Sequence, residues 1–169
     1  GGLTDDLIKG GLAKDLIDGG HGNDTIYGNG GRDTITGGGG DDTIHGNEGN
    51  DKLTGGDGND SLFWETTDAN DTPSGGAGFD RLIVNGKATA DTISITQTSG
   101  GGAKLQIYNG TYRITVGTRL EQIVIDTGDG DDAITVSNLH GVPGVLLLIN
   151  GQDGNDTIDA TDARMGSVR

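Results

Sequence analysis

The chain has 169 residues, a formal net charge of −15 and no cysteine, which excludes a disulfide framework and suits one or two domains. So acidic a surface disfavours nucleic acid and anionic membranes as partners. No apolar run approaches the length of a membrane-spanning helix, so we expect no membrane insertion. Glycine accounts for 35 residues and aromatic residues for only 4%. Such a composition would indicate disorder if the glycines were scattered, but they recur at regular positions.

Residues 1–63 form seven consecutive units of nine residues. Each unit opens with glycine and carries an aspartate at its sixth position and an aliphatic residue at its eighth. Glycine also fills the fourth position from the third unit onward. The sixth-position aspartates are Asp6, Asp15, Asp24, Asp33, Asp42, Asp51 and Asp60. Seven aspartates in one phase indicate a repeat architecture.

Each unit combines a glycine-rich turn with a short strand. Glycine permits positive φ and close approach of the backbone, so the first six residues of a unit are predicted to turn. The last three, such as 25–27 (Thr-Ile-Tyr), have strand composition with only the middle residue pointing inward. Such strands are stable only when stacked, which predicts an all-β parallel β-solenoid with two units per coil. Aspartates eighteen residues apart, such as Asp24 and Asp42, would then lie on adjacent rungs about 5 Å apart.

This arrangement calls for a cation. Two carboxylates about 5 Å apart repel by roughly 3 kcal/mol at an effective dielectric constant near 20. Oxygen ligands without histidine or cysteine suit calcium. One buried Ile or Leu per unit contributes about 2–3 kcal/mol, whereas ordering nine backbones costs on the order of 9–18 kcal/mol. Metal binding is therefore expected to supply folding energy.

The units GGHGNDTIY (19–27) and GGDGNDSLF (55–63) resemble the RTX, or hemolysin-type, calcium-binding repeat G-G-x-G-x-D-x-U-x, in which U is aliphatic. The resemblance covers residues 1–63 and returns at 75–83, 127–135 and 151–159. It implies a right-handed parallel β-roll, or β-helix, that binds several Ca2+ ions in its turns. The ligands implied are sixth-position aspartates and carbonyl oxygens of turn glycines: Asp6, Asp15, Asp24, Asp33, Asp42, Asp51, Asp60, Asp80, Asp132, Asp156, Gly20, Gly22, Gly38, Gly40, Gly56 and Gly58. Thr4 and Ala13 replace the fourth-position glycine in the first two units, so the pattern supports calcium at Asp6 and Asp15 less strongly.

Residues 64–74 interrupt the nine-residue register. They form either a surface insertion or a lengthened turn in which Asp71 takes the sixth position and Pro73 the eighth; the spacing of Asp60, Asp71 and Asp80 favours the turn. Trp64 is expected to cover the edge of a core. The predicted organisation is a β-roll of seven units over 1–63, an irregular turn plus one further unit over 64–83, and a β-helix with longer rungs and two more calcium-type turns over 84–169.

The second half is predicted to consist of further strands. Runs rich in β-branched residues occupy 82–84, 92–96, 105–108, 112–116, 122–125, 133–136 and 145–149. The pair at 109–110 (Asn-Gly) predicts a type I′ hairpin near residues 104–117 that projects from the solenoid. The apolar run 145–149 is expected to be a strand buried on both faces. Asp91 has the right phase but lacks supporting glycines, so we expect no full calcium site there.

No catalytic motif is present: the chain has no H-E-x-x-H pair, no G-x-S-x-G elbow and no Walker loop. His21 and His45 occupy variable repeat positions and are expected to be solvated. The chain opens on a repeat glycine without methionine, so we expect it to be a segment of a larger protein.

The sequence favours a non-enzymatic, extracellular calcium-binding module that folds on meeting calcium. It would serve as a structural or adhesive segment of a secreted or cell-surface bacterial protein or filament, with self-association or cell-surface assembly as candidate roles. The alternative is an accessory or secretion module of a secreted enzyme such as a protease, lipase or epimerase. A less favoured third hypothesis is a metal-free β-helix that presents a threonine row (Thr25, Thr34, Thr43) to ice or carbohydrate.

Overall fold

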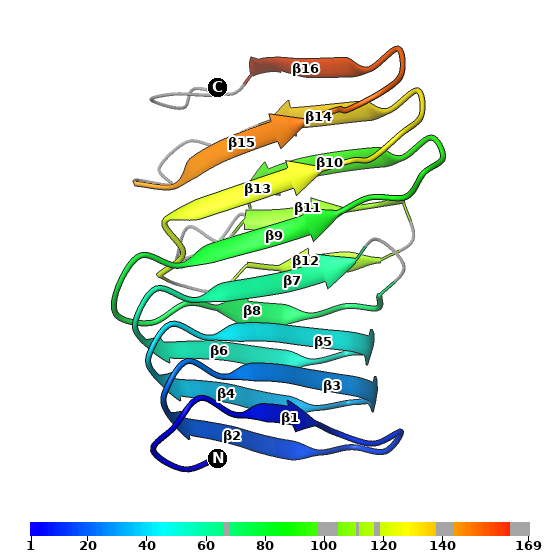
Figure 1. The fold of residues 1–169 in the computed structure, drawn as a ribbon. Coiled ribbons are helices and arrows are strands. Elements are labelled where there is room, and N and C mark those ends of the chain that lie inside the picture. The colour runs from blue at the N-terminus through cyan, green and yellow to red at the C-terminus, as the bar shows by residue number, and fades with distance from the viewer. Residues whose placement is uncertain (66–67, 98–104, 111, 117–118, 138–143, 163–169) are drawn as a thin grey trace.

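The computed structural model describes residues 1–65, 68–97, 105–110, 112–116, 119–137 and 144–162. Within these ranges the chain forms strands and turns without any helix, stacked into a solenoid (Figure 1). The strands are β1 (Leu7–Lys9), β2 (Leu16–His21), β3 (Thr25–Gly31), β4 (Thr34–Gly39), β5 (Thr43–Gly49), β6 (Lys52–Asp57), β7 (Ser61–Glu65), β8 (Thr72–Ser74), β9 (Arg81–Asn85), β10 (Thr92–Gln97), β11 (Leu105–Tyr108), β12 (Arg113–Thr115), β13 (Gln122–Asp126), β14 (Ala133–Ser137), β15 (Leu146–Asn150) and β16 (Thr157–Asp162). In these ranges no helix is long and apolar enough to cross a membrane.

Two walls of β-sheet enclose the interior. The first wall is one seven-stranded sheet in the order β1-β3-β5-β7-β9-β13-β15. The second wall is formed by a four-stranded sheet, β2-β4-β6-β8, and a five-stranded sheet, β12-β11-β10-β14-β16. The chain alternates between the walls in residues 1–63, so one coil takes two nine-residue units, as predicted. The strands of the first wall run in one direction and those behind return in the other while the chain rises, which makes the solenoid right-handed (Figure 1).

The parallel register aligns equivalent positions of the units. Ile26 pairs with Ile8 on one side and with Ile44 on the other. The ladder continues further than expected, because β3 extends through the first four residues of the next unit and pairs Gly31 with Gly49. Turn glycines permit this close stacking: a Cβ atom added to Gly38 would lie 2.0 Å from the carbonyl oxygen of Gly20.

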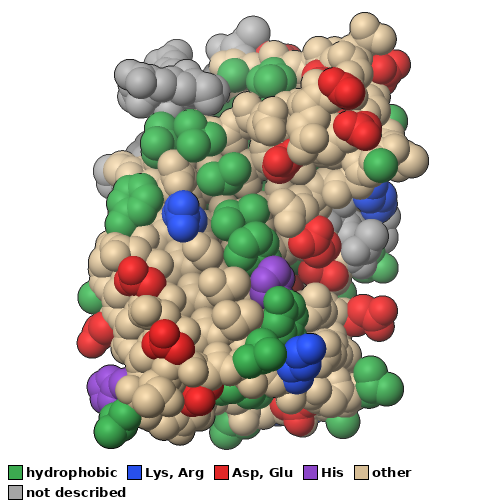
Figure 2. Space-filling view, viewed as in Figure 1, with side chains coloured by type: hydrophobic (Ala, Val, Ile, Leu, Met, Phe, Trp, Pro, Cys, Tyr) green, Lys and Arg blue, Asp and Glu red, His purple; other side chains and the backbone are tan. Residues whose placement is uncertain are grey.

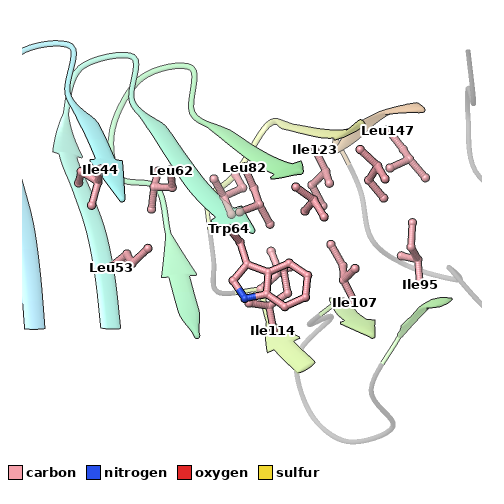
Figure 3. Close-up of a cluster of buried hydrophobic side chains, with 14 of the residues drawn as sticks. Ile44, Leu53, Leu62, Trp64, Leu82, Ile95, Ile107, Ile114, Ile123 and Leu147 are labelled. Atoms are coloured by element: carbon pink, nitrogen blue, oxygen red, sulfur yellow. The ribbon is translucent and has the colours of Figure 1, made fainter. Parts of the chain in front are cut away.

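A thin aliphatic column fills the interior. Burial alternates along the strands, so that in β3 and β4 the eighth-position isoleucine points inward and its neighbours do not. Figure 3 shows these side chains meeting between the two walls. The residues buried in this core are Ile17, Ile26, Ile35, Ile44, Leu53, Leu62, Trp64, Leu82, Val84, Ile93, Ile95, Ile107, Ile114, Val116, Leu120, Ile123, Ile125, Ile134, Val136 and Leu147.

The irregular segment after β7 continues the coil as a lengthened turn. Pro73 of β8 pairs with Leu53 of β6 and is buried, so it takes the place of the eighth-position aliphatic residue. Trp64 is fully buried, and its Nε1 donates a 3.0 Å hydrogen bond to the carbonyl oxygen of Ala69. The tryptophan lies in the interior beside Ile114 (Figure 3), deeper than the core edge expected from the sequence.

The expected hairpin is present, but it lies within the second wall and does not project from it. Strand β11 pairs antiparallel with both β10 and β12, and Ile107 and Ile114 are fully buried in the core. The main-chain N–H of Thr115 donates to the carbonyl oxygen of Asp71, which joins the hairpin to the coil below. Asn109 and Gly110 are not the central pair of a type I′ turn, because Gly110 has positive φ (86°) and Asn109 does not.

The inserted hairpin gives the second wall two more strands than the first within the described residues. Two strand spacings amount to about 10 Å along the axis. The strands of the first wall slope differently above β7 than below it (Figure 1). The first-wall strands that follow β7 are therefore inclined to those that precede it (Figure 1).

The outer face of the first wall departs from two expectations. Leu147 of β15 is buried, but Leu146 and Leu148 are half-buried, so this strand is not buried on both faces. His45 is also half-buried, because its ring stacks between Tyr27 and Phe63 at centroid distances of 4.7 and 4.3 Å. Hydrophobic side chains gather along the middle of this face (Figure 2).

Candidate metal centre

The sixth-position aspartates form columns along the two edges of the solenoid. The first edge carries the turns that lead into the first wall, and the second edge carries the turns that lead into the second wall. On the first edge the column contains Asp6, Asp24, Asp42, Asp60 and Asp80. On the second edge it contains Asp15, Asp33, Asp51 and Asp71 below the hairpin, and Asp91, Asp132 and Asp156 above it.

One oxygen of most of these carboxylates is held by the backbone of the neighbouring coil. The main-chain N–H of Asp24 donates to Oδ1 of Asp42 at 2.8 Å, and that of Asp42 donates to Oδ1 of Asp60 at 2.9 Å. On the second edge the N–H of Asp33 reaches Oδ1 of Asp51 at 2.7 Å. These bonds fix each side chain on its rung and aim its second oxygen into the glycine turn.

The second oxygen is buried without a hydrogen-bond partner in most of these turns. The aspartates whose Oδ2 is in this state are Asp24, Asp33, Asp42, Asp51, Asp60, Asp71 and Asp132. A buried carboxylate oxygen that lacks a donor carries an uncompensated desolvation cost, which native proteins rarely tolerate. The repetition of this arrangement at seven equivalent positions is what turns built to receive a positively charged ligand would show.

The backbone of the second residue in the turn decides whether Oδ2 is left open. Where that residue has positive φ, as at Gly20 (103°), Gly38 (125°) and Gly56 (138°), Oδ2 of the aspartate four residues later accepts no hydrogen bond. On the second edge Asn29 and Asn47 adopt the same conformation, with φ of 70° and 64°. Asparagine tolerates the left-handed region better than other non-glycine residues. We call these open turns.

The remaining turns satisfy their own carboxylate. The second residues of these turns are Gly2, Gly11, Gly76 and Lys87, and none has positive φ. Their N–H groups donate to Oδ2 of the aspartate four residues later, at distances of 2.6 to 3.0 Å. The four aspartates capped in this way are Asp6, Asp15, Asp80 and Asp91. We call these closed turns.

Burial raises the pKa of four carboxyl groups in the columns, those of Asp42, Asp51, Asp60 and Asp71. Desolvation raises the pKa of Asp51 and of Asp60 to about 6, and that of Asp71 to about 8. Neighbouring carboxylates raise these values further, whereas the main-chain hydrogen bond from the adjacent coil lowers them. The pKa of Asp42 is raised for the same reasons. Without a cation these groups therefore hold protons more tightly than an exposed aspartate does.

The donor set of an open turn fits a hard divalent cation. In the described part of the chain, no three His, Cys, Asp or Glu side chains gather into a ready cluster, so main-chain oxygens must supplement the carboxylates. The turns leave room only for glycine backbone around the carboxylate: a Cβ atom added to Gly37 would lie 2.3 Å from Oδ2 of Asp42, and one added to Gly55 would lie 2.1 Å from Oδ2 of Asp60. Oxygen donors alone suit Ca2+.

The predicted site residues divide between the two kinds of turn. Asp24, Asp33, Asp42, Asp51, Asp60 and Asp132 lie in open turns and are buried. Asp156 belongs with them, because Gln152 at the second position has positive φ (57°). Asp6, Asp15 and Asp80 lie in closed turns. The glycines named from the sequence, Gly20, Gly22, Gly38, Gly40, Gly56 and Gly58, all have positive φ in the turns.

Three acidic residues of the columns were absent from the sequence-based set. Asp71 was foreseen only as a stand-in within the lengthened turn, and its Oδ1 accepts from Asp51 like a regular member. Asp91 lies in the column but in a closed turn. Glu121 ends the first-edge column, because its Oε2 accepts a 2.8 Å bond from the N–H of Asp80. No periodic signal marks Glu121, since it is a glutamate at irregular spacing.

Comparison with known proteins finds one matching family model and a similar solved structure. The family model described as "RTX calcium-binding nonapeptide repeat" matches the chain in four copies, over residues 1–35, 27–62 and 148–162. Among solved structures, the solution structure of the AlgE6R3 subunit from the Azotobacter vinelandii mannuronan C5-epimerase is similar. It is 22% identical, with 67% of this chain and 70% of that chain covered and a TM-score of 0.34. No curated protein matches the chain significantly.

Proposed function

We propose that this chain, which carries RTX calcium-binding nonapeptide repeats, is a structural module that binds several Ca2+ ions through its open turns and completes its folding when it does so. The observation that carries the proposal is the set of buried, unpartnered Oδ2 atoms in those turns. Bound calcium would supply the positive charge that offsets their desolvation and mutual repulsion. Because ligands must be deprotonated to bind metal, binding and folding are coupled to pH.

The two kinds of turn are proposed to differ in how tightly they bind calcium. Open turns present an aspartate oxygen and a left-handed backbone, and we propose them as the ion-binding turns. Their aspartates are Asp24, Asp33, Asp42, Asp51, Asp60, Asp132 and Asp156. Asp71 is proposed with them because its Oδ2 is also buried and unpartnered, although the second position of its turn lies outside the described residues. Closed turns satisfy Oδ2 with a main-chain N–H and can keep their shape without an ion. The coils at Asp6, Asp15, Asp80 and Asp91 are thus proposed to bind calcium more weakly or not at all.

The setting we propose is extracellular, where calcium is abundant enough for sites of modest affinity. The chain would remain incompletely folded where calcium is scarce and would complete its roll where calcium is plentiful. Its role there is that of a non-enzymatic structural or adhesive segment of a secreted or cell-surface protein, with self-association or surface assembly as the mode of use. The resemblance of residues 1–62 and 148–162 to RTX repeats supports this role, as does the absence of a catalytic motif from the sequence.

A second candidate is an accessory module of a secreted enzyme. RTX repeats on their own are compatible with either role, and the discriminating observation is whether the full reading frame of the parent protein encodes a catalytic domain. A threonine-presenting surface is not favoured by the geometry. Thr25 and Thr43 pair in the first wall, whereas Thr34 lies in the second wall, so the three do not form one row.

The test is a calcium titration of the chain followed by far-UV circular dichroism, with magnesium as the control ion. We expect a transition to β-structure that is specific to calcium. The variant Asp24→Asn/Asp42→Asn/Asp60→Asn should shift the midpoint to higher calcium, because each substitution removes a carboxylate from an open turn of the first edge. The matched control Asp5→Asn/Asp41→Asn/Asp57→Asn removes three exposed charges from the same edge and should move the midpoint little. An unchanged spectrum on adding calcium, or equal shifts in both variants, would refute the proposal.

A further inference from the structure

The second edge carries a polar groove lined by cations on an otherwise acidic molecule. Its volume is about 490 Å³. Lys14, Arg32 and Lys52 line it, together with the exposed amides of Asn50 and Asn70. Three positive side chains in one groove are unexpected in a chain with only 11 Lys and Arg residues and a net charge of −15.

This groove is specific to one edge of the solenoid. On the second edge, the fifth positions of successive coils carry Lys14, Arg32 and Asn50. On the first edge, the same position carries Asp5, Asn23, Asp41 and Asn59. The side-chain Oδ1 atoms of Asp5, Asn23 and Asp41 each accept a main-chain N–H of the next coil. Both edges have the same backbone architecture, so the repeat fold does not require basic residues at this position. Their concentration on one edge indicates a negatively charged ligand.

The column continues upward beyond the groove. The N–H of Asn70 donates to Oδ1 of Asn50 at 3.0 Å, and the N–H of Arg113 donates to Oδ1 of Asn70 at 2.8 Å. Arg113, which is exposed, therefore stands one rung above Asn70 on the inserted hairpin. The polar column thus extends over five successive rungs, from Lys14 to Arg113, at about 5 Å per rung. A surface of this shape fits an extended ligand better than a compact one.

The cations of the groove are available to a ligand. Lys14, Arg32 and Lys52 are exposed, and no carboxylate among the described residues forms an ion pair with them. Asp33 and Asp51 line the same groove, but both are buried, and their Oδ1 atoms accept main-chain N–H groups. Both belong to open turns. Calcium in those turns would neutralise the two negative charges and leave the groove with a net positive charge.

We propose that this groove binds an extended acidic polysaccharide, one whose sugar units carry carboxylates, when calcium occupies the adjacent turns. The proposal rests on the calcium-binding function proposed above. Ammonium and guanidinium groups would pair with the carboxylates. The hydroxyls of Thr34 and Thr72 and the amides of Asn50 and Asn70 would bond to sugar hydroxyls. No aromatic side chain lines the groove to stack on bases, and the overall negative charge opposes a long nucleic acid.

The test uses the 169-residue chain in excess calcium and isothermal titration calorimetry with hexagalacturonate. Excess calcium keeps the oligosaccharide from depleting the ions in the turns. We expect binding that weakens with added salt, and no comparable binding of the neutral oligosaccharide maltohexaose. The variant Lys14→Gln/Arg32→Gln/Lys52→Gln should lose affinity by about tenfold or more. The matched control Lys9→Gln/Arg81→Gln/Lys87→Gln removes the same charge from other positions and should bind nearly as the unmodified chain does.

The outcomes separate this proposal from the calcium function. Circular dichroism must first show that both variants fold with calcium; a chain that does not fold with calcium refutes the function on which the groove depends. If the chain folds but does not bind hexagalacturonate, or if both variants lose affinity equally, the groove proposal is wrong. Equal affinity for inorganic phosphate would overturn it in favour of a simple anion site. Equal affinity for a hexa-aspartate peptide would overturn it in favour of an acidic protein partner.

Discussion

The main-chain N–H of Asp51 donates a 2.8 Å hydrogen bond to Oδ1 of Asp71, twenty residues further along the chain. Lower on the same edge the corresponding bonds join residues eighteen apart, as between Asp15 and Asp33. The two additional residues are accommodated in the turn before Asp71, and the carboxylate column is preserved across the irregularity. Asp71 therefore stands as a regular member of the column despite its position outside the nine-residue phase.

Substitution of Asp71 should weaken calcium binding without destabilising the metal-free fold. Burial raises the pKa of Asp71 to about 8, so at pH 7 its side chain is mostly protonated when no ion is present. The neutral variant Asp71→Asn resembles that state. We expect one fewer bound calcium ion by native mass spectrometry and an unfolding free energy in chelator that stays within about 0.5 kcal/mol of the unmodified chain. A loss of stability in chelator equal to the loss in calcium would contradict this assignment.

The metal-free fold should become more stable as the pH falls. The pKa values of Asp51 and Asp60 are raised to about 6 and that of Asp71 to about 8, so the folded state binds more protons than the unfolded state below pH 8. Stability without calcium then rises as the pH falls from about 8 towards 5. Because protons and calcium compete for the same oxygens, the calcium midpoint should fall as the pH rises over that interval. Thermal unfolding at several pH values, with and without calcium, measures both trends. Parallel trends in the two conditions would count against competition.

The ring stack on the first wall should contribute an opposite pH dependence. Desolvation lowers the pKa of His45, which packs between Tyr27 and Phe63. A lowered histidine pKa gives stability that is present above about pH 6.5 and is lost as the pH falls through the folded-state value. His45→Phe should keep the stack and remove this loss, whereas His45→Ala should cost about 1–3 kcal/mol by removing two ring contacts. Urea unfolding in saturating calcium tests both variants, and equal stability of the two would rule out a role for the stack.

Glycine at the second turn position should be indispensable where its φ is positive and the coil below lies close, as at Gly38, and replaceable where neither holds, as at Gly2. Gly38 has a φ of 125°, and a Cβ atom there would lie 2.0 Å from a carbonyl oxygen of the coil below. Gly38→Ala should therefore destabilise the calcium-loaded fold by at least about 2 kcal/mol. The matched control is Gly2→Ala, because Gly2 does not have positive φ and a Cβ atom there meets nothing within 4 Å. Equal effects measured by urea unfolding would argue against a requirement for glycine at Gly38.

The repeating part of the fold was predictable because each unit repeats the same physical requirements. The aspartate phase placed Asp24, Asp42 and Asp60 on one edge, and the aliphatic phase placed Ile26 and Ile44 in the core. RTX repeats over 1–62 and 148–162, the right-handed parallel β-solenoid and the burial of the eighth position from Ile17 to Leu62 are confirmed. The calcium ligands themselves, and the division of the chain at residues 63 and 83, stay predictions.

The rest of the fold depends on contacts between distant residues, which no local sequence pattern indicates. The hairpin was foreseen, but its insertion into the wall rests on the bond from Thr115 to Asp71, forty-four positions apart in the chain. Likewise, open and closed turns differ in the φ of one residue, and both Gly2 and Gly20 occupy that position as glycine. Asn29 and Asn47 could have indicated open turns from the sequence, because asparagine, like glycine, adopts the left-handed conformation more readily than most residues.

The unequal walls have a mechanical consequence. Every face of a regular solenoid is straight, so a partner surface that docks along one face can extend over the full length of the solenoid. Here the inserted strands β11 and β12 make the second wall longer than the first, and the first-wall strands above β7 slope differently from those below it (Figure 1). A partner that docks along the first wall therefore meets a change of strand direction at a defined place.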